Sequence, residues 1–333
     1  MRIKFLSLML LTLIFCSKNT NSPEEYEGDA KFRILALDNN NEAYASGMGK
    51  IVVELNENKG NGNIEPVEKT FLISLNGAGV GEFVFKGQDL ADHNDNIKIK
   101  EVSVLNHVFE EVGKTESEII VGFGKMIYET VNLDVECKNV FWERLDFRRE
   151  FDLSGIKVLI IVGRDFDYNE CMYISNYLEY YGAEVKIASC LETIQGHDID
   201  IPPLSPIIYT NYSITVDILL DDVNLDDYDC LFFPGGSGPA NMLNDYPQIT
   251  DLVVSAYNKN ILIAAICHGP LVLAEAGILN GIQATGYEDT QDTIVNNGGI
   301  YVTEKIVVSG RVITGNWPYF NTMATTIAEH LQN

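Results

Sequence analysis

Residues 261–270, with the sequence ILIAAICHGP, constrain the fold of this chain more than any other stretch. The apolar run 261–265 predicts a buried strand of a parallel sheet. Cys267 and His268 follow on a turn. Gly269 and Pro270 then open an apolar helical stretch, because proline suits the first turn of a helix. A strand, a sharp turn that carries a nucleophile, and a helix together make a nucleophile elbow.

The residues around Cys267 favour a reactive thiol. Ala265 and Gly269 lie two residues to either side of it, where an elbow leaves little room. The positive end of the helix dipole meets the thiol, so we expect its pKa to lie below the ordinary value of about 8.5. A packed structural cysteine is the alternative, since a free thiol also behaves as a small hydrophobic group.

The second half of the chain, 154–333, alternates strands and helices. Apolar strands are predicted at 157–162, 185–188, 230–233 and 261–265, with helices at 168–181, 248–258 and 319–331. A small hairpin is expected within 207–216. This alternation predicts an α/β fold, a flavodoxin-like doubly wound sheet that is mostly parallel. Ligands of such sheets bind at the carboxyl ends of the strands.

Two segments of this half carry a family resemblance. AICHGP, preceded by YDCLFFPGGSGPANML, resembles the DJ-1/PfpI superfamily, and the resemblance runs over residues 156–331. It implies that Cys267 is a nucleophile and that His268 belongs to the Cys-His pair that the PfpI branch uses in catalysis. It also implies that Glu170 points at the thiol, although a glutamate at a helix start is equally explained by the helix dipole.

The same resemblance implies the rest of the site. The N–H groups of Gly236 and His268 would form an oxyanion hole after the turn at Gly235, and Tyr287 and Trp317 would line the pocket. PfpI-type peptidases carry an acidic residue after the proline of the GG-x-x-P segment. Ala240 stands there in this chain, so the carboxylate-oriented triad is incomplete at that position.

These residues imply thiol chemistry on a small carbonyl or amide substrate, of the glyoxalase, hydrolase or amidase kind. We expect no cofactor and no metal, a small-molecule substrate, and a homodimer or larger homo-oligomer. Two alternatives stay open: a non-catalytic surface module that senses oxidation or binds a protein, and a PfpI-type cysteine peptidase.

Residues 29–136 follow a different pattern. About seven short segments alternate apolar and polar side chains, which predicts an all-β, sandwich-like domain of the immunoglobulin type. The alternation slips near Glu101, which predicts a β-bulge. Residues 137–153 are a mixed, charged connector, in which Trp142 and Phe147 are expected to pack against a domain.

Charge and the amino terminus limit partners and location. A formal net charge of −25 repels phosphate backbones, so nucleic-acid binding is not expected. Residues 1–16 form a basic start and a short apolar run that ends at Cys16, which resembles a lipoprotein signal, and 17–28 form a polar linker. We expect an exported protein: a cell-envelope lipoprotein, or a periplasmic or extracellular one. Membrane attachment is expected only through an amino-terminal lipid or anchor.

The prediction for Cys16 is a lipid-modified mature amino terminus. Expressed from its own start in a bacterium, the chain should enter the membrane fraction, and Cys16→Ser should release it while leaving its fold intact. Mass spectrometry of the mature terminus provides the measurement. An unmodified chain beginning after Cys16 would contradict lipidation and leave export standing.

Overall fold

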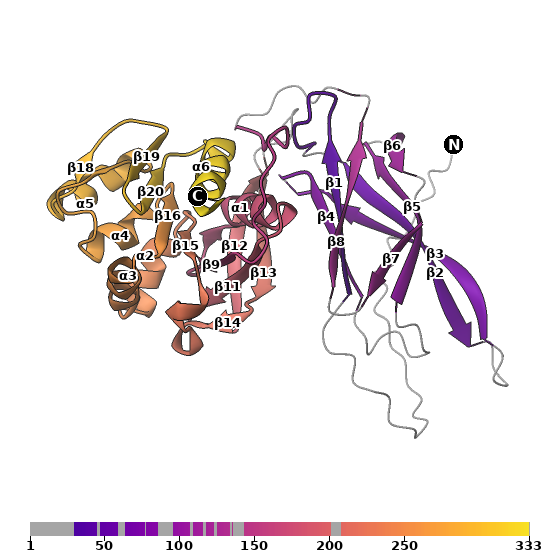
Figure 1. Ribbon diagram of the computed structural model, residues 1–333, viewed down its shortest axis with the longest axis horizontal. Coiled ribbons are helices and arrows are strands. Elements are labelled where there is room, and N and C mark those ends of the chain that lie inside the picture. Colours follow the sequence, from indigo (N-terminus) through magenta and orange to yellow (C-terminus); the bar gives the residue numbers. More distant parts are fainter. Residues whose placement is uncertain are drawn as a thin grey trace, which may run out of the picture. The chain divides into compact units, whose positions relative to one another are not determined.

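A computed structural model describes residues 30–44, 47–58, 64–76, 78–85, 96–106, 109–115, 118–122, 125–133, 135, 143–200 and 208–332 (Figure 1). Cys16, the linker 17–28 and Trp142 lie outside these ranges. Within the described part, no helix combines the length and the apolar character needed to cross a membrane.

The sheet of the second half has seven strands in the order β14-β11-β9-β15-β16-β20-β19. All neighbours run parallel except β19 and β20. When the five central strands are numbered in chain order, they follow the flavodoxin-like order 2-1-3-4-5. The predicted fold class is therefore confirmed. These strands are β9 (Lys157–Ile161), β11 (Glu184–Ser189), β15 (Cys230–Phe233), β16 (Leu262–Ile266) and β20 (Val312–Gly315), with β14 (Ile218–Leu219) and β19 (Ile306–Ser309) at the edges.

Helices cover both faces of this sheet. One face packs a continuous apolar core against α2, α3, α4 and α5, whereas α1 packs with α6 on the other face. Burial on both faces explains why the central strands are almost wholly apolar. The helices are α1 (Tyr168–Tyr180), α2 (Gly238–Asp245), α3 (Ile249–Asn258), α4 (Pro270–Glu275), α5 (Gln291–Asn296) and α6 (Phe320–Gln332).

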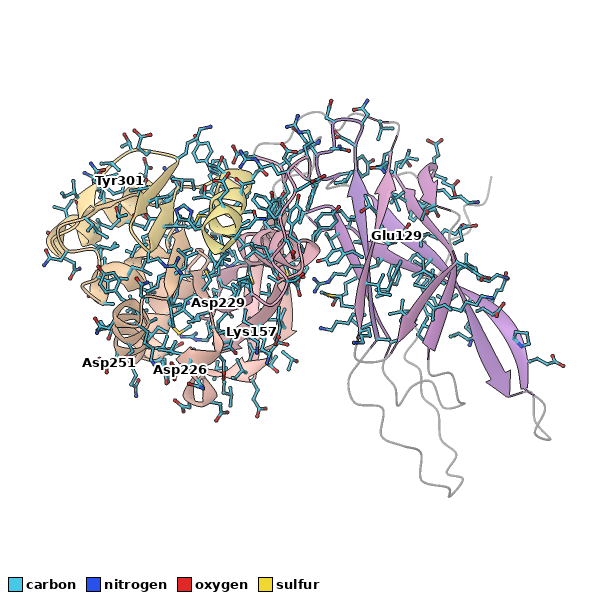
Figure 2. All side chains as sticks on the ribbon, viewed as in Figure 1. Glu129, Lys157, Asp226, Asp229, Asp251 and Tyr301 are labelled. Carbon is cyan, nitrogen blue, oxygen red and sulfur yellow. The ribbon has the colours of Figure 1, made fainter. Side chains whose placement is uncertain are left out.

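The two edges of the sheet differ in content. At the amino ends of the strands, the Lys157 N–H donates to Asp229 Oδ2 at 2.9 Å, and the Asp229 N–H donates to the Lys157 carbonyl at 2.8 Å (Figure 2). These contacts only align β9 with β15. The segments that follow Ile161, Phe233 and Ile266 all leave from the carboxyl edge, which is where the candidate site lies.

The predicted hairpin was misplaced. It is formed by β12 (Thr193–Asp200) and β13 (Ile208–Thr215), which pair antiparallel along their full length, and β12 also pairs with β10 (Phe166–Asp167). The first strand escaped prediction because TIQGHDID has no apolar run. Helix α2 was also missed, although Pro239 in its first turn is a helix-start signal. Short elements complete this half: η2 (Leu220–Asp222), η3 (Leu225–Asp227), β17 (Gln283–Ala284), η4 (Glu288–Thr290) and β18 (Ile300–Tyr301).

The amino-terminal part is built from strands, as predicted. Three form one sheet in the order β4-β1-β8, and the others form a second sheet in the order β3-β2-β5-β6, with β7 also paired to β5. Val52 pairs with Glu101 and Val53 with Ile99, so Lys100 is the extra residue of a bulge beside the predicted position. The strands are β1 (Ala30–Leu37), β2 (Met48–Asn58), β3 (Ile64–Ser74), β4 (Val80–Phe85), β5 (Asn96–Leu105), β6 (Glu111–Thr115), β7 (Ile119–Gly122) and β8 (Met126–Asn132).

The chain divides into two compact units that do not follow a single cut in the sequence. The first comprises Met1–Ile34, Met48–Ser74 and Gly81–Val131, and the second comprises Leu35–Gly47, Leu75–Val80 and Asn132–Asn333. The domain boundaries expected from the sequence, 29–136 and 154–333, therefore stay a prediction.

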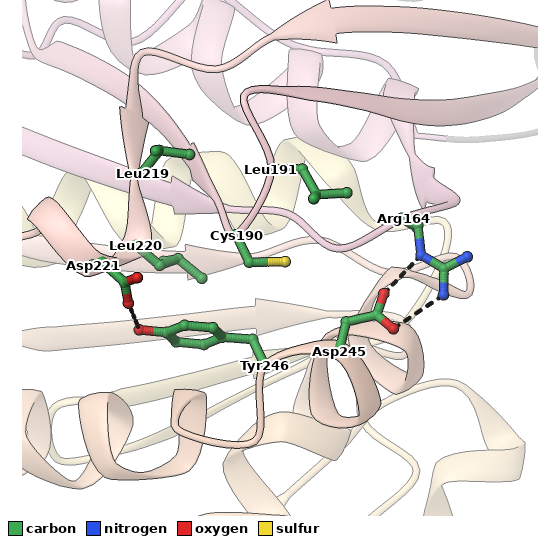
Figure 3. A pocket seen from close by; sticks show the side chains of 8 residues that line it. All are labelled: Arg164, Cys190, Leu191, Leu219, Leu220, Asp221, Asp245 and Tyr246. Atoms are coloured by element: carbon green, nitrogen blue, oxygen red, sulfur yellow. Dashed lines mark hydrogen bonds and ion pairs between the residues drawn. The ribbon is translucent and has the colours of Figure 1, made fainter.

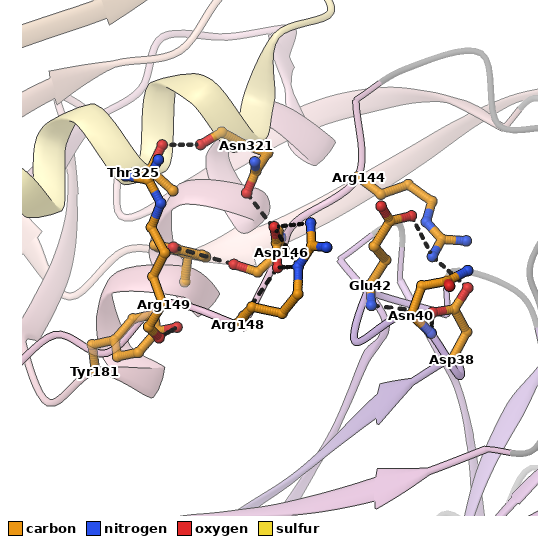
Figure 4. Close-up of polar contacts among 11 residues, drawn as sticks. Asp38, Asn40, Glu42, Arg144, Asp146, Arg148, Arg149, Tyr181, Asn321 and Thr325 are labelled. Atoms are coloured by element: carbon orange, nitrogen blue, oxygen red, sulfur yellow. Dashed lines mark hydrogen bonds and ion pairs between the residues drawn. The ribbon is translucent and has the colours of Figure 1, made fainter.

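The connector packs within the second unit (Figure 4). The Phe147 ring lies 4.8 Å from the Tyr180 ring and 5.2 Å from the Tyr177 ring, between centroids. The Asp146 N–H donates to Asn321 Oδ1 at 2.8 Å at the start of α6. Arg144 is almost fully buried and pairs with Asp38 at 2.7 Å and Glu42 at 2.8 Å. The connector is therefore structured where it is described.

These contacts predict that the length of the connector sets the stability of a carboxyl-terminal fragment. Fragments 143–333 and 152–333 should both melt cooperatively. The shorter one loses the burial of Phe147, worth about 1.5–3 kcal/mol, and should melt lower by roughly 3–12 °C for a domain of this size. Calorimetry provides the comparison. Phe147→Ala in the longer fragment should reproduce most of the loss and Arg148→Ala, at an exposed position, should not; equal melting of the two fragments would contradict the prediction.

Candidate active site

Cys267 lies at the sharp turn between β16 and α4, as the elbow prediction requires. Its backbone φ is 58°, in the left-handed region that costs a residue with a side chain about 1–2 kcal/mol. Backbone hydrogen bonds hold it there: the Cys267 N–H donates to the Gly315 carbonyl at 2.9 Å, and the Cys267 carbonyl accepts from the Tyr287 N–H at 2.8 Å. Cys267 is buried, with 7% of its surface exposed.

Three segments from the carboxyl edge of the sheet converge at Gly235. A Cβ at this residue would lie 2.6 Å from Cys267 Cβ, 2.8 Å from Glu170 Oε2 and 2.9 Å from the His268 nitrogen. Only glycine fits in that space. The predicted residues Glu170, Gly235, Cys267 and His268 are therefore brought together.

Glu170 is fully buried, and its hydrogen bonding departs from that of an ordinary helix start. Asp167, Tyr168, Asn169 and Glu170 form the D-x-x-E pattern of a capping box, and the Glu170 N–H donates to Asp167 Oδ1 at 3.0 Å. In a regular box the glutamate would bind the Asp167 N–H. Here that N–H donates to the Gly235 carbonyl at 3.0 Å, and Glu170 Oε2 accepts from the Gly235 N–H at 2.5 Å. The Gly235 N–H thus turns Glu170 towards the elbow.

The second carboxyl oxygen, Glu170 Oε1, is buried and has no hydrogen-bond partner. The Glu170 carboxyl lies close enough to the Cys267 thiol for each group to affect the pKa of the other. Burial raises the pKa of Glu170 well above its ordinary value, and the charge of Asp167 raises it further. The environment therefore favours the protonated form of this carboxyl.

The pKa expected for Cys267 from the sequence was wrong. Burial raises it well above the ordinary value, and the neighbouring Glu170 and Asp167 act in the same direction. A hydrogen bond from the Gly236 N–H opposes the rise. The dipole of α4, a helix of six residues, does not compensate for the loss of water around the sulfur. The resting group is a thiol, so attack on a substrate requires a base.

His268 is placed to act as that base. Its Nδ1 lies 3.3 Å from the Cys267 sulfur, and its Nε2 lies 3.0 Å from Asp289 Oδ1 and 3.1 Å from Oδ2. An Nε2–H that donates to Asp289 leaves the Nδ1 lone pair facing the thiol, which is the tautomer that accepts its proton. Asp289, a carboxylate of the same chain, is thus placed to orient the histidine, which Ala240 cannot do.

The other predicted residues are placed less decisively. The Tyr287 ring lies 5.2 Å from the His268 ring, between centroids, and is 36% exposed. Gly236 has a φ of 71° and donates towards the sulfur, which agrees with an oxyanion role without testing it. Trp317 is partly buried two residues after Gly315, and its place in the pocket stays a prediction.

Sequence reasoning missed Asp167 and Asp289. The D-x-x-E pattern would have revealed the first. The second stands two residues after Tyr287, in the motif GYED, but its approach to His268 depends on how the turn η4 folds. Among the described residues, no group of three or more histidine, cysteine, aspartate or glutamate side chains is arranged to hold a metal ion.

Comparison with known proteins identifies the family. Residues 156–329 match the DJ-1/PfpI family. The chain belongs to the DJ-1/PfpI family. It is 32% identical to deglycase PH1704 of Pyrococcus horikoshii and 30% identical to deglycase PfpI of Pyrococcus furiosus, each over 165 residues that cover 49% of this chain and 91% of the relative.

Among solved structures, this DJ-1/PfpI chain is similar to a two-domain protein from Anabaena variabilis that contains DJ-1/ThiJ/PfpI-like and ferritin-like domains. That similarity has 29% identity and a TM-score of 0.46, and it covers 53% of this chain and 49% of that one. The relatives match only the carboxyl-terminal half, so they carry no information on the amino-terminal strands.

The raised pKa of Glu170 predicts a pH-dependent stability for this DJ-1/PfpI chain. Between the ordinary carboxyl pKa of about 4.3 and the raised value, the folded chain holds a proton that the unfolded chain releases, so stability falls as pH rises. Glu170→Gln removes this titration. Its stability relative to wild type should therefore increase as the pH rises above the ordinary carboxyl pKa.

Denaturant unfolding at several pH values provides the measurement, with Glu192→Gln, at an exposed position, as the matched control. Asp167, whose pKa is also raised by burial, contributes in the same direction, so the wild-type slope should shrink without vanishing. A Glu170→Gln curve parallel to wild type would contradict a neutral Glu170.

Proposed function

We propose that Cys267 is the nucleophile of a cofactor-free enzyme that acts on small carbonyl compounds or amides. Deglycation is the reaction best supported. The observation that carries this proposal is the series of contacts from the Cys267 sulfur to His268 Nδ1 and from His268 Nε2 to Asp289. Two relatives that share 165 aligned residues with this chain are named deglycases.

The proposed first step pairs proton transfer with attack. His268 Nδ1 takes the thiol proton as the sulfur bonds to the carbonyl carbon, so that no free thiolate has to exist in the buried resting site. The carbonyl oxygen gains negative charge and accepts from the N–H groups of Gly236 and His268. Asp289 stabilises the imidazolium that forms.

The following step releases the leaving group. With an amide, the C–N bond of the tetrahedral intermediate breaks, and the nitrogen takes the proton from His268. With a carbonyl–amine adduct, the sulfur replaces the amine on the carbon that carried it, and a proton then moves from that carbon to the neighbouring carbonyl carbon, so that a thioester forms without any external oxidant. Water then attacks the carbon bound to Cys267, and the sulfur regains its proton. A protonated Glu170, whose Oε1 has no hydrogen-bond partner, would donate a hydrogen bond to the sulfur.

The test is turnover by the full chain with an adduct of methylglyoxal and an amino acid, a simple anilide and a peptide. Cys267→Ser should reduce turnover to the uncatalysed rate. Asp289→Asn should lower kcat by roughly 10²-fold, at the lower end of general acid–base contributions because the carboxylate is exposed.

Asp292→Asn is the matched control, because it removes the same charge from an exposed position of α5 and should leave kcat unchanged. Turnover of the peptide alone would favour the peptidase alternative. Equal kcat in wild type and Asp289→Asn would remove the proposed role of Asp289.

A redox sensor is a second candidate, favoured by the same unpartnered oxygen. Oxidation of Cys267 to a sulfinate would place an oxygen where a protonated Glu170 can donate to it. Reversible or graded oxidation of Cys267 under mild peroxide, in a chain without turnover on any of the three substrates, would support this function instead.

A further inference from the structure

A cavity of about 460 Å³ opens at the carboxyl edge of the sheet, away from the residues of the Cys267 site (Figure 3). Its walls come from the segments after β9, β11 and β14 and from the end of α2. Its size falls in the usual range for small-molecule sites, and this edge is where doubly wound sheets bind ligands. It is lined by Arg164, Cys190, Leu191, Leu219, Leu220, Asp221, Asp245 and Tyr246.

The polar side chains of this cavity are arranged in two pairs. Arg164 donates twice to Asp245, at 2.7 and 3.1 Å, and the Tyr246 hydroxyl donates to Asp221 Oδ1 at 2.6 Å. The hydrogen bond from Arg164 holds the pKa of Asp245 below its ordinary value, so this carboxylate is charged at neutral pH. The bond to Asp221 raises the pKa of Tyr246 to about 12, so the phenol keeps its proton.

One guanidinium faces two carboxylates, so the lining carries a net negative charge. A carboxylate has about four acceptor positions. Asp245 uses two of them for Arg164 and Asp221 uses one for Tyr246, which leaves positions for a donor from outside. The three leucines add an apolar wall. The cavity therefore suits a compact molecule with an apolar body and a positively charged, hydrogen-bond-donating end.

Cys190 adds a covalent function to this surface. It is a free, half-buried thiol, whereas the other described cysteines, Cys171, Cys230 and Cys267, are buried. Figure 3 shows its sulfur pointing into the space between Leu191 and the Arg164–Asp245 pair. A disulfide held here can exchange with it: the Cys190 sulfur bonds to one ligand sulfur, the ligand S–S bond breaks, and the released thiol takes the proton.

We propose that this cavity is a second small-molecule site, which binds aminothiols supplied as disulfides and holds one half as a mixed disulfide on Cys190. The proposal does not depend on the function of Cys267, because the two sites share no residue.

The test compares three disulfides of similar length on the folded full chain: cystamine, which is cationic, 2-hydroxyethyl disulfide, which is neutral, and 3,3′-dithiodipropionate, which is anionic. The rate of modification at Cys190 is followed by peptide mass mapping, and each rate is divided by that of the same residue in the unfolded chain. The normalised rate with cystamine should exceed that with dithiodipropionate by about tenfold or more, and the rate with the neutral disulfide should lie between them. A tenfold difference corresponds to about 1.4 kcal/mol.

Matched variants separate the cavity from the overall charge of the chain. Asp245→Asn and Asp221→Asn should each reduce the preference several-fold, and Asp245→Asn should do so more strongly because it also leaves Arg164 unneutralised. Asp292→Asn, which removes one charge outside the cavity, should leave the preference for the cationic disulfide unchanged. A moderate salt concentration in every sample reduces the long-range electrostatic attraction between the chain and the disulfide.

A non-covalent arm checks binding itself. The thioether 2-(methylthio)ethylamine cannot form a disulfide, and it should slow the alkylation of Cys190 by iodoacetamide without slowing that of Cys190 in the Asp245→Asn, Asp221→Asn double variant. Equal normalised rates for the three disulfides, or equal effects of Asp292→Asn and Asp245→Asn, would overturn the proposal. Melting curves confirm that each variant is folded.

Discussion

The backbone of Gly235 is the structural element on which the rest of the site depends. Its carbonyl accepts the Asp167 N–H and its N–H donates to Glu170, so one residue joins the start of α1 to the end of β15. The missing side chain lets Cys267 approach from β16 on the other side. The strands β9, β15 and β16 are neighbours in the sheet. The segments that follow their carboxyl ends therefore leave the same edge side by side and can meet at Gly235. A residue with a Cβ at this position would have to displace the elbow, the carboxyl group or both.

The burial that this arrangement imposes determines how the thiol can react. Water is excluded from both Glu170 and Cys267, and both pKa values rise, because a charge on either group is poorly solvated. A site of this kind stores its proton on the sulfur until a substrate arrives. His268 and Asp289 lie nearer to solvent, where an imidazolium is solvated as it forms. The division between a dry thiol and a wetter base explains how a residue with an unfavourable resting pKa can still serve as a nucleophile.

Much of this arrangement followed from the sequence, and the exceptions have physical reasons. The apolar strands around Lys157–Ile161 and Leu262–Ile266 and the small residues at the elbow were predictable because burial on both faces leaves few alternatives. Asp289 was not, since its contact with His268 depends on a turn whose sequence is compatible with several orientations. The thiol pKa was mispredicted because the helix-dipole argument is local, whereas desolvation depends on everything packed around the sulfur. The strand Thr193–Asp200 lacked a signal because it lies outside the main core and is mostly polar.

The same edge of the sheet carries two thiols in opposite environments, and the difference follows from the strands that position them. Cys267 follows β16, inside the sheet, where the segments that follow the neighbouring strands bury it. Cys190 follows β11, one strand from the edge, where the next strand, β14, has two residues and cannot cover it. The space beside Cys190 is lined by polar and apolar side chains from the segments around β14 and from the end of α2, and it stays open as a cavity. A central position therefore favours chemistry in a dry, pre-arranged site, whereas a position near the edge favours reversible binding of a small molecule from solvent.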